Sequence, residues 1–155
     1  MEIVLAKSAG FCFGVNRAIE AVNNAIGTDD IYTYGPIIHN KTVTEDLEKR
    51  GVKCIENIDD VKSGTIVLRS HGVGKEIYDE IENKGLKIID GTCPFVKKIH
   101  DIVNEKYSQG YKIIIVGDKI HPEVIGINGW CQNSAFIAKT VEEAEKFEAK
   151  KDAKY

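Results

Sequence analysis

The sequence has little of what marks nucleic-acid-binding or membrane proteins. Its 155 residues contain 21 Lys and Arg against 24 Asp and Glu, which gives a formal net charge of −3. Non-specific binding to nucleic acid depends on a basic surplus, and none is present. Wholly apolar runs reach only the length of Ile113–Val116, whereas a helix that spans a bilayer needs roughly 20 apolar residues. We therefore expect a globular protein that binds neither nucleic acid nor membranes.

Cysteines are also few, and their spacing excludes common sites. Cys12, Cys54, Cys93 and Cys131 include no Cys-x-x-Cys pair, so neither a zinc ribbon nor a thioredoxin-type site is indicated. The amino terminus has no basic segment followed by an apolar core, which a secretory signal would require. We therefore expect reduced thiols in a cytoplasmic protein. Cys54, within an expected strand, and Cys131, after an expected helix, favour structural roles.

Short β-rich runs alternate along the chain with segments of helical periodicity. Strands are expected at Ile3–Ala6, Ile31–Tyr34, Val52–Ile55, Thr65–Leu68, Leu86–Ile89, Tyr111–Val116 and Ala135–Ala138. Helices are expected at Val15–Ile26, Thr42–Lys49, Lys75–Asn83, Phe95–Tyr107, from Pro122, and at Val141–Lys150. This alternation predicts an α/β fold of parallel strands with helices on both faces of the sheet.

The carboxyl end departs from that alternation. Lys150–Tyr155 close the chain where a further strand would normally follow a helix. This indicates either a frayed terminal helix or a chain cut within a domain.

Five residues with metal-binding, acid–base or nucleophilic side chains occupy one kind of position. Cys12, His39, His71, Cys93 and His121 each lie between an expected strand and the helix that follows it. Because the carboxyl ends of parallel strands meet at one edge of a sheet, these residues are expected to face one cleft. His100 lies inside an expected helix and is interpreted as a surface or packing histidine.

The two cysteines of this set have different surroundings. Cys12 lies in the run Ala9–Gly14, where two phenylalanines and two glycines flank it; such an apolar shell suits a buried metal cluster. Cys93 follows Thr92, a suitable N-cap, and precedes Pro94, which is favoured in a first helical turn. The positive end of the helix dipole favours a thiolate there. Either cysteine is also compatible with a purely structural position.

The three histidines before helices point to an anion site. Imidazoles at His39, His71 and His121, beside unpaired helix N–H groups, would favour phosphate; the alternative is that each only caps a helix. Glu123 lies two residues after His121 and is a candidate proton donor, although an acid in a first turn commonly complements the dipole. Gly72–Lys75 lacks the upstream glycine and the Ser/Thr of a phosphate-binding P-loop.

Five segments together carry a resemblance to one family. They are Ala9–Val15 (AGFCFGV), Ile38–Asn40 (IHN), Arg69–Val73 (RSHGV), Gly91–Pro94 (GTCP) and His121–Val124 (HPEV). In these motifs and their order the sequence resembles 4-hydroxy-3-methylbut-2-enyl diphosphate reductase, the oxidoreductase that ends the methylerythritol phosphate route to isoprenoids. The resemblance runs from Met1 to about Phe147.

The resemblance implies a site and a reaction. Family members hold a 4Fe–4S cluster by three cysteines, of which Cys12 and Cys93 match the first two. His39, His71 and His121 match the residues that bind the substrate diphosphate, and Glu123 matches the acid that delivers a proton. Ferredoxin or flavodoxin gives two electrons, water leaves, and isopentenyl and dimethylallyl diphosphate are formed.

The resemblance also implies a division of the chain. Family members have three similar α/β units: residues 1–95 match the first, and residues 96–155 match an incomplete second. Residues 1–13 match a strand that packs with the third unit, and that unit and the third cysteine are absent. The expected protein is thus a truncated reductase, inactive alone. Two alternatives stay open: a non-catalytic diphosphate-binding module without iron, and a Cys–His hydrolase.

Overall fold

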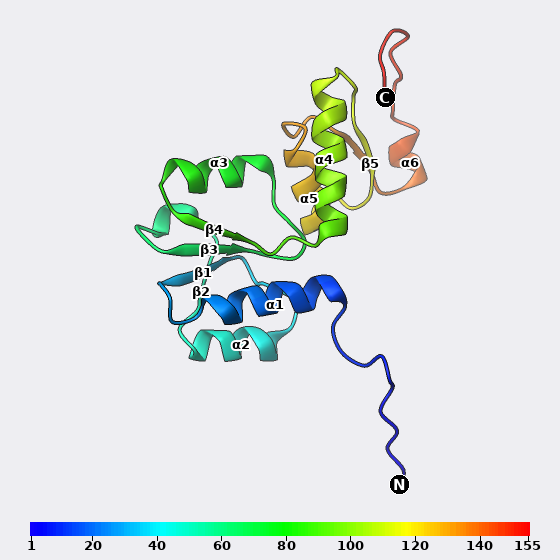
Figure 1. The fold of residues 1–155 in the computed structure, drawn as a ribbon. Coiled ribbons are helices and arrows are strands. Elements are labelled where there is room, and N and C mark those ends of the chain that lie inside the picture. Colours follow the sequence, from blue (N-terminus) through cyan, green and yellow to red (C-terminus); the bar gives the residue numbers. More distant parts are fainter.

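The computed structural model describes residues 1–155 as an α/β protein with two parallel sheets (Figure 1). The elements are α1 (Phe13–Ala25), β1 (Ile31–Tyr34), α2 (Lys41–Lys49), β2 (Lys53–Ile55), the 3₁₀ helix η1 (Ile58–Asp60), β3 (Thr65–Leu68), α3 (Lys75–Asn83), β4 (Lys87–Asp90), α4 (Pro94–Ser108), β5 (Ile114–Val116), α5 (Pro122–Gly129), β6 (Phe136–Ala138) and α6 (Val141–Ala144). The first sheet has the order β2-β1-β3-β4, and β5 pairs with β6 in the second. Every strand pair is parallel, which confirms the predicted fold class.

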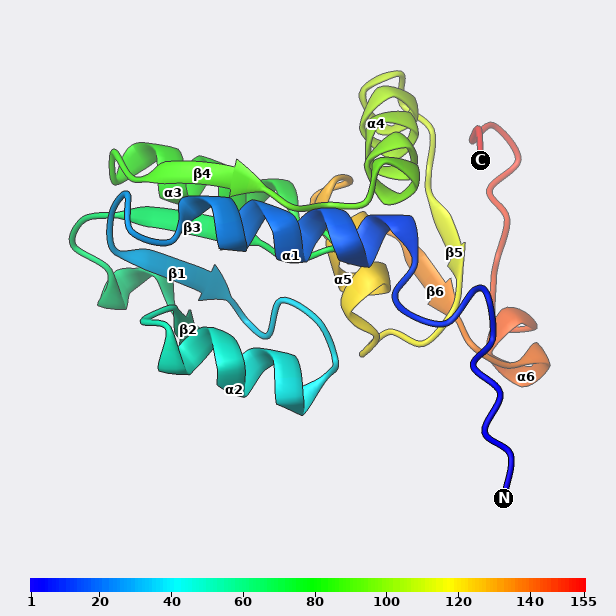
Figure 2. The same ribbon diagram turned by 60° about the horizontal axis from the view of Figure 1, so that its bottom comes forward.

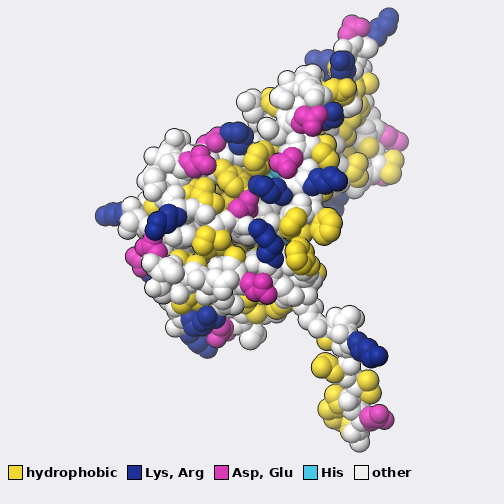
Figure 3. All heavy atoms as spheres, viewed as in Figure 1, with side chains coloured by type: hydrophobic (Ala, Val, Ile, Leu, Met, Phe, Trp, Pro, Cys, Tyr) yellow, Lys and Arg dark blue, Asp and Glu magenta, His cyan; other side chains and the backbone are white.

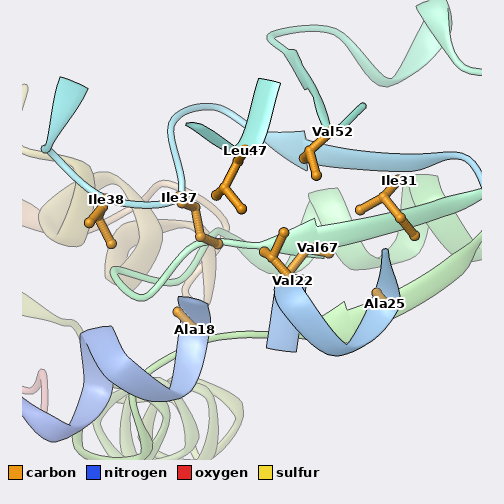
Figure 4. Close-up of a cluster of buried hydrophobic side chains, with 9 residues drawn as sticks. All are labelled: Ala18, Val22, Ala25, Ile31, Ile37, Ile38, Leu47, Val52 and Val67. Atoms are coloured by element: carbon orange, nitrogen blue, oxygen red, sulfur yellow. The ribbon is translucent and has the colours of Figure 1, made fainter. Parts of the chain in front are cut away.

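Strand β3 is the centre of the first sheet because its side chains are buried on both faces. Val67 joins an apolar cluster between the sheet and helices α1 and α2 (Figure 4). Ile66 and Leu68 point to the opposite face and pack with Ile81 of α3. Each fully buried aliphatic side chain of this kind contributes about 1.5–3 kcal/mol. Helices therefore cover both faces of this sheet, with α1 and α2 on one side and α3 on the other (Figure 1).

The amino-terminal segment differs from the prediction. Residues 1–12 form no strand, and Ile3, Val4 and Leu5 are 81–82% exposed. Figure 2 shows this segment extending away from the body, and Figure 3 shows its apolar side chains in the open. A β-strand is stabilised by hydrogen bonds to a neighbouring strand, and no strand of this chain pairs with it.

The last part of the chain also has less regular structure than predicted. Strand β5 is limited to the three residues that pair with β6, and before it Lys112 N–H donates to Lys154 O (2.8 Å) instead. Helix α6 ends at Ala144 rather than near Lys150. It has no buried residue, so no packed face extends it. None of the helices is both long and apolar enough to cross a membrane.

Candidate active site

The three histidines predicted to share a site lie together at the carboxyl edge of the sheets. The ring centroid of His71 is 4.9 Å from that of His39 and 6.3 Å from that of His121. His71 follows β3, His39 follows β1, and His121 precedes α5. Parallel strand alignment therefore gathers three imidazoles from separate loops into one cluster, with His71 in the middle.

Side-chain caps fix two of the histidine loops. Asn40, next to His39, accepts a hydrogen bond from the N–H of Val43 (3.2 Å) and caps α2. His121 itself caps α5, because its Nδ1 accepts from the N–H of Glu123 (3.2 Å). Accepting at Nδ1 leaves the proton of the neutral ring on Nε2. Capping and anion binding are thus compatible in His121, since the two ring nitrogens serve different partners.

The surroundings of His71 are mostly positive and leave one of its ring nitrogens without a partner. Burial lowers its pKa, and the positive charges of His39, Arg69 and His121 lower it further, while Glu123 raises it. Its Nδ1 is buried and has no hydrogen-bond partner. A bound anion would act on this ring in the opposite sense, because a nearby negative charge favours the protonated form of His71. The cluster is therefore suited to a multiply charged anion.

Two glycines of helix α5 allow this helix to pack closely against the loop that carries His71. The backbone of Gly72 and Val73 lies 3.5 Å from the position a Cβ would take on Gly126, and a Cβ on Gly129 would come 2.5 Å from the Cα of Gly74. The indole N–H of Trp130 donates to the carbonyl of Val73 (3.0 Å). These contacts pack the carboxyl-terminal half of α5 against the loop that carries His71. No pattern within the sequence predicts these contacts, because they join two segments that are far apart in the chain.

The two glycines of α5 make a matched pair for testing this contact. Gly129→Ala is expected to lower the free energy of unfolding by about 1–3 kcal/mol, because its Cβ meets backbone that has to move. Gly126→Ala is expected to be neutral or to stabilise by about 0.5–1 kcal/mol, because its Cβ makes ordinary contacts within a helix. Urea denaturation measures both. Equal stability of the two variants would show that α5 does not press on this loop.

His100 packs behind the cluster and is not a surface residue. It is 1% exposed and stacks on Trp130, with centroids 5.4 Å apart and planes 21° from parallel. Gly72 has φ +72°, and a Cβ there would come 2.5 Å from Cε1 of His100, so only glycine fits between the two. Burial lowers the pKa of His100 to about 4, and neither ring nitrogen has a partner. Of the two predicted roles, packing is the right one.

The loops of Cys12 and Cys93 adjoin each other. Each cysteine is the N-cap of a helix, Cys12 of α1 and Cys93 of α4. The Sγ of Cys93 lies 2.7 Å from where a Cβ on Gly14 would stand, so this thiol rests against the first turn of α1. Arg17 of α1 donates to the carbonyl of Thr92 (2.9 Å) and ties the loops together. Both thiols therefore lie at the positive ends of helix dipoles.

Two expectations about these loops are wrong. Phe11 and Phe13 are 41% and 65% exposed and Cys12 is exposed, so the phenyl rings do not enclose the sulfur. Thr92 is not the N-cap of α4. Its side chain is buried, and its N–H donates to Asp90 Oδ1 (2.9 Å) in the turn before the helix.

The remaining cysteines are apart from this pair. Cys131 is buried and its thiol donates to the carbonyl of Asn128 (3.2 Å), as expected of a structural position. Cys54 lies in strand β2, as expected, and is exposed at the edge of the sheet. No three His, Cys, Asp or Glu side chains converge on a common metal position. Cys12 and Cys93 thus fit two ligands of a cluster, and this chain places no third beside them.

A large cavity of the structure lies away from these residues. It has a volume of about 680 Å³, and its walls include Tyr107, Phe136, Phe147 and Tyr155 but no histidine or cysteine. We place the candidate site at the histidines and the two thiols because imidazole and thiol groups bind anions and metals, whereas the titratable groups in the walls of this cavity are only tyrosines, lysines and one glutamate.

Comparison with known proteins identifies the family. The sequence profile described as "LytB protein" matches residues 3–155. The chain belongs to the LytB family. The 4-hydroxy-3-methylbut-2-enyl diphosphate reductase of Caldanaerobacter subterraneus subsp. tengcongensis is 52% identical over 151 residues, which cover 94% of this chain and 52% of that protein. This chain thus spans about half the length of the curated LytB relatives it matches.

Solved structures agree with the LytB assignment. The structure of the E-1-hydroxy-2-methyl-but-2-enyl-4-diphosphate reductase from Plasmodium falciparum superposes with a TM-score of 0.89 at 35% identity, covering 95% of this chain and 47% of that one. A second structure, of the (E)-4-hydroxy-3-methyl-but-2-enyl diphosphate reductase described as the terminal enzyme of the non-mevalonate pathway, gives a TM-score of 0.77 at 39% identity, covering 91% of this chain and 52% of that one.

Proposed function

We propose that this chain is the amino-terminal half of a 4-hydroxy-3-methylbut-2-enyl diphosphate reductase, which removes the allylic hydroxyl and gives isopentenyl and dimethylallyl diphosphate. The observation that carries the proposal is the cluster of His39, His71 and His121. The ring centroid of His71 lies 4.9 Å from that of His39 and 6.3 Å from that of His121. Curated LytB relatives of about twice the length bear this enzyme's name.

The three histidines would bind and orient the diphosphate. Charged hydrogen-bond donors that converge on phosphate oxygens are stronger than neutral ones. The buried His71 would take the central position, and His121 would donate from Nε2 while its Nδ1 stays on the helix. Holding the diphosphate at this end of the site would direct the allylic hydroxyl toward the two thiol loops.

Glu123 would deliver the proton that the departing hydroxyl needs. Its backbone N–H is held by His121, and its charge raises the pKa of the central histidine. Its side chain is half-buried, and from this position the carboxyl would protonate a group bound beside the histidines.

Cys12 and Cys93 would hold an iron–sulfur cluster together with a third ligand from the part of the longer relatives that this chain does not match. Both cysteines stand at helix N-termini, where the positive end of the helix dipole suits a negatively charged ligand group. When bound, a 4Fe–4S cluster supplies the electrons for the reduction. We infer that ferredoxin or flavodoxin is the electron donor, that the enzyme works in the cytoplasm, and that residues 1–95 and 96–155 are its first and an incomplete second unit.

The exposed apolar surface of this chain supports the proposal that it is one half of a longer enzyme. Phe95, Ile99 and Ile102 lie on one face of α4 and are 74%, 44% and 47% exposed. Neighbouring exposed apolar side chains commonly mark a contact surface. Together with the unpaired segment at Ile3–Leu5, this face would pack against the other half of the enzyme.

Binding of inorganic diphosphate tests the proposed anion site in this chain alone. Titration is expected to shift the NMR signals of the His39, His71 and His121 rings, and to move His100 much less because that ring is buried behind the cluster. Replacing any one of the three by Ala is expected to weaken binding roughly 10-fold, with the largest loss at His71, because a charge-assisted hydrogen bond contributes about 1.5–3 kcal/mol.

The same titration distinguishes anion binding from simple capping. Monovalent chloride is expected to bind more weakly than diphosphate, because several donors act on one multiply charged ligand. Unchanged diphosphate affinity in all three Ala variants would leave the histidines with capping roles only.

A further inference from the structure

Arg69 is a cation without a negative partner. It follows β3 and is half-buried, and its Nε is fully buried without a hydrogen-bond partner. No salt bridge of the structure includes it. The other side chains that act on its charge are Tyr34 and Cys54, and burial raises the pKa of Tyr34, which keeps that phenol neutral. A charge withdrawn from water without a partner destabilises the fold.

The guanidinium lies against the loop that leads to His39, on the chain segment that carries His71. Gly35 has φ +67°, and a Cβ there would come 3.0 Å from Nη1 of Arg69. The positive charge of Arg69 is also among those that act on His71. Arg69 therefore adjoins two of the three histidine loops.

We propose that Arg69 is a further anion-binding residue of the histidine site, whose guanidinium supplies the permanent positive charge for a bound diphosphate. The inference rests on the proposed function of the histidine cluster. In this proposal the bound diphosphate is the negative partner that Arg69 lacks in the free protein, which accounts for an unpaired cation at this position. Arginine suits the role, since its planar fork of donors matches phosphate oxygens.

A permanent charge also changes how binding depends on pH. Burial lowers the pKa of His71, so this ring becomes neutral as the pH rises from about 6 to about 8, and the groups facing it are the other two histidines, Arg69 and Glu123. Arginine stays charged throughout this range. Diphosphate binding above neutral pH would therefore depend mainly on Arg69.

The test compares Arg69→Gln with Arg50→Gln in this chain. Arg50 is an exposed arginine paired with Asp46 at the end of α2, so the control removes the same charge elsewhere. Arg69→Gln is expected to weaken binding of inorganic diphosphate roughly 10-fold or more, with the larger loss at about pH 8 than at about pH 6. Arg50→Gln is expected to change it less than about twofold. Arg69→Lys is expected to be intermediate.

Thermal unfolding separates a binding role from a structural one. Without ligand, Arg69→Gln is expected to be at least as stable as the parent, because it removes an unpaired charge, and it is expected to lose most of the stabilisation that diphosphate gives. An unstable Arg69→Gln variant with parental affinity would overturn the inference and make Arg69 a structural residue. If the parent itself does not bind diphosphate, it is the proposed function that fails.

Discussion

Replacing Glu123 by Gln is expected to lower turnover by roughly 10²–10⁴-fold in a full-length reductase whose amino-terminal half has this sequence. A hydroxyl leaves poorly as hydroxide near neutral pH, so the departing oxygen needs a proton. The amide of Gln keeps the shape and hydrogen bonding of the carboxyl group but has no proton to give. Because the backbone N–H of residue 123, not its side chain, is what His121 accepts, the cap and substrate affinity are expected to persist.

The control for this experiment is Glu142→Gln, which removes an acid from the first turn of α6. If Glu123 only complements the dipole of α5, both variants lose at most about 1 kcal/mol of stability and keep their turnover. Turnover is measured on protein whose iron and sulfide content equals that of the parent. A Glu123→Gln enzyme within a few-fold of the parental rate would rule out proton delivery by Glu123.

The parts of the fold that the sequence predicts well are those set by local pattern. Strands Ile31–Tyr34 and Thr65–Leu68 and helix Lys75–Asn83 have the predicted bounds. Both strands are rich in β-branched and aromatic residues and are buried or half-buried along their length. The helix ends before Gly85, which has φ +67°. Parallel pairing then follows from the helical crossovers, and with it the gathering of His39, His71 and His121.

The parts that the sequence does not predict depend on partners distant in the chain. Ile3–Ala6 has the composition of a strand, but pairing requires a neighbour that this chain does not place there. The fit of Gly129 on Gly74 and the burial of His100 arise from packing between α4, α5 and the loop after β3. Periodicity within one helix does not identify which polar side chain its neighbours cover, so the sequence alone is compatible with a surface or a packing role for His100.

The buried His100 is expected to make the protein sensitive to acid. The unfolded chain binds a proton at His100 below about pH 6.5, whereas burial lowers the pKa in the folded protein to about 4. Between these values the unfolded state binds more protons, so stability falls as the pH decreases through this window and is fully present above it. A difference of this size corresponds to about 3 kcal/mol once the pH reaches the lower value.

His100→Phe isolates this effect, because a phenyl ring keeps the stacking on Trp130 and does not titrate. Urea denaturation at a series of pH values is expected to show the parent losing about 3 kcal/mol more than the variant between about pH 6.5 and pH 4. Other titrating groups, including His71 and the neighbours Lys97, Asp90 and Asp101, are present in both proteins and largely cancel in the comparison. At neutral pH the variant is expected to be at least as stable, since it removes two buried nitrogens without partners. Parallel stability curves for the two proteins would mean that His100 is hydrated in solution, and the packing of α4 and Trp130 behind His71 would then be looser than the structure describes.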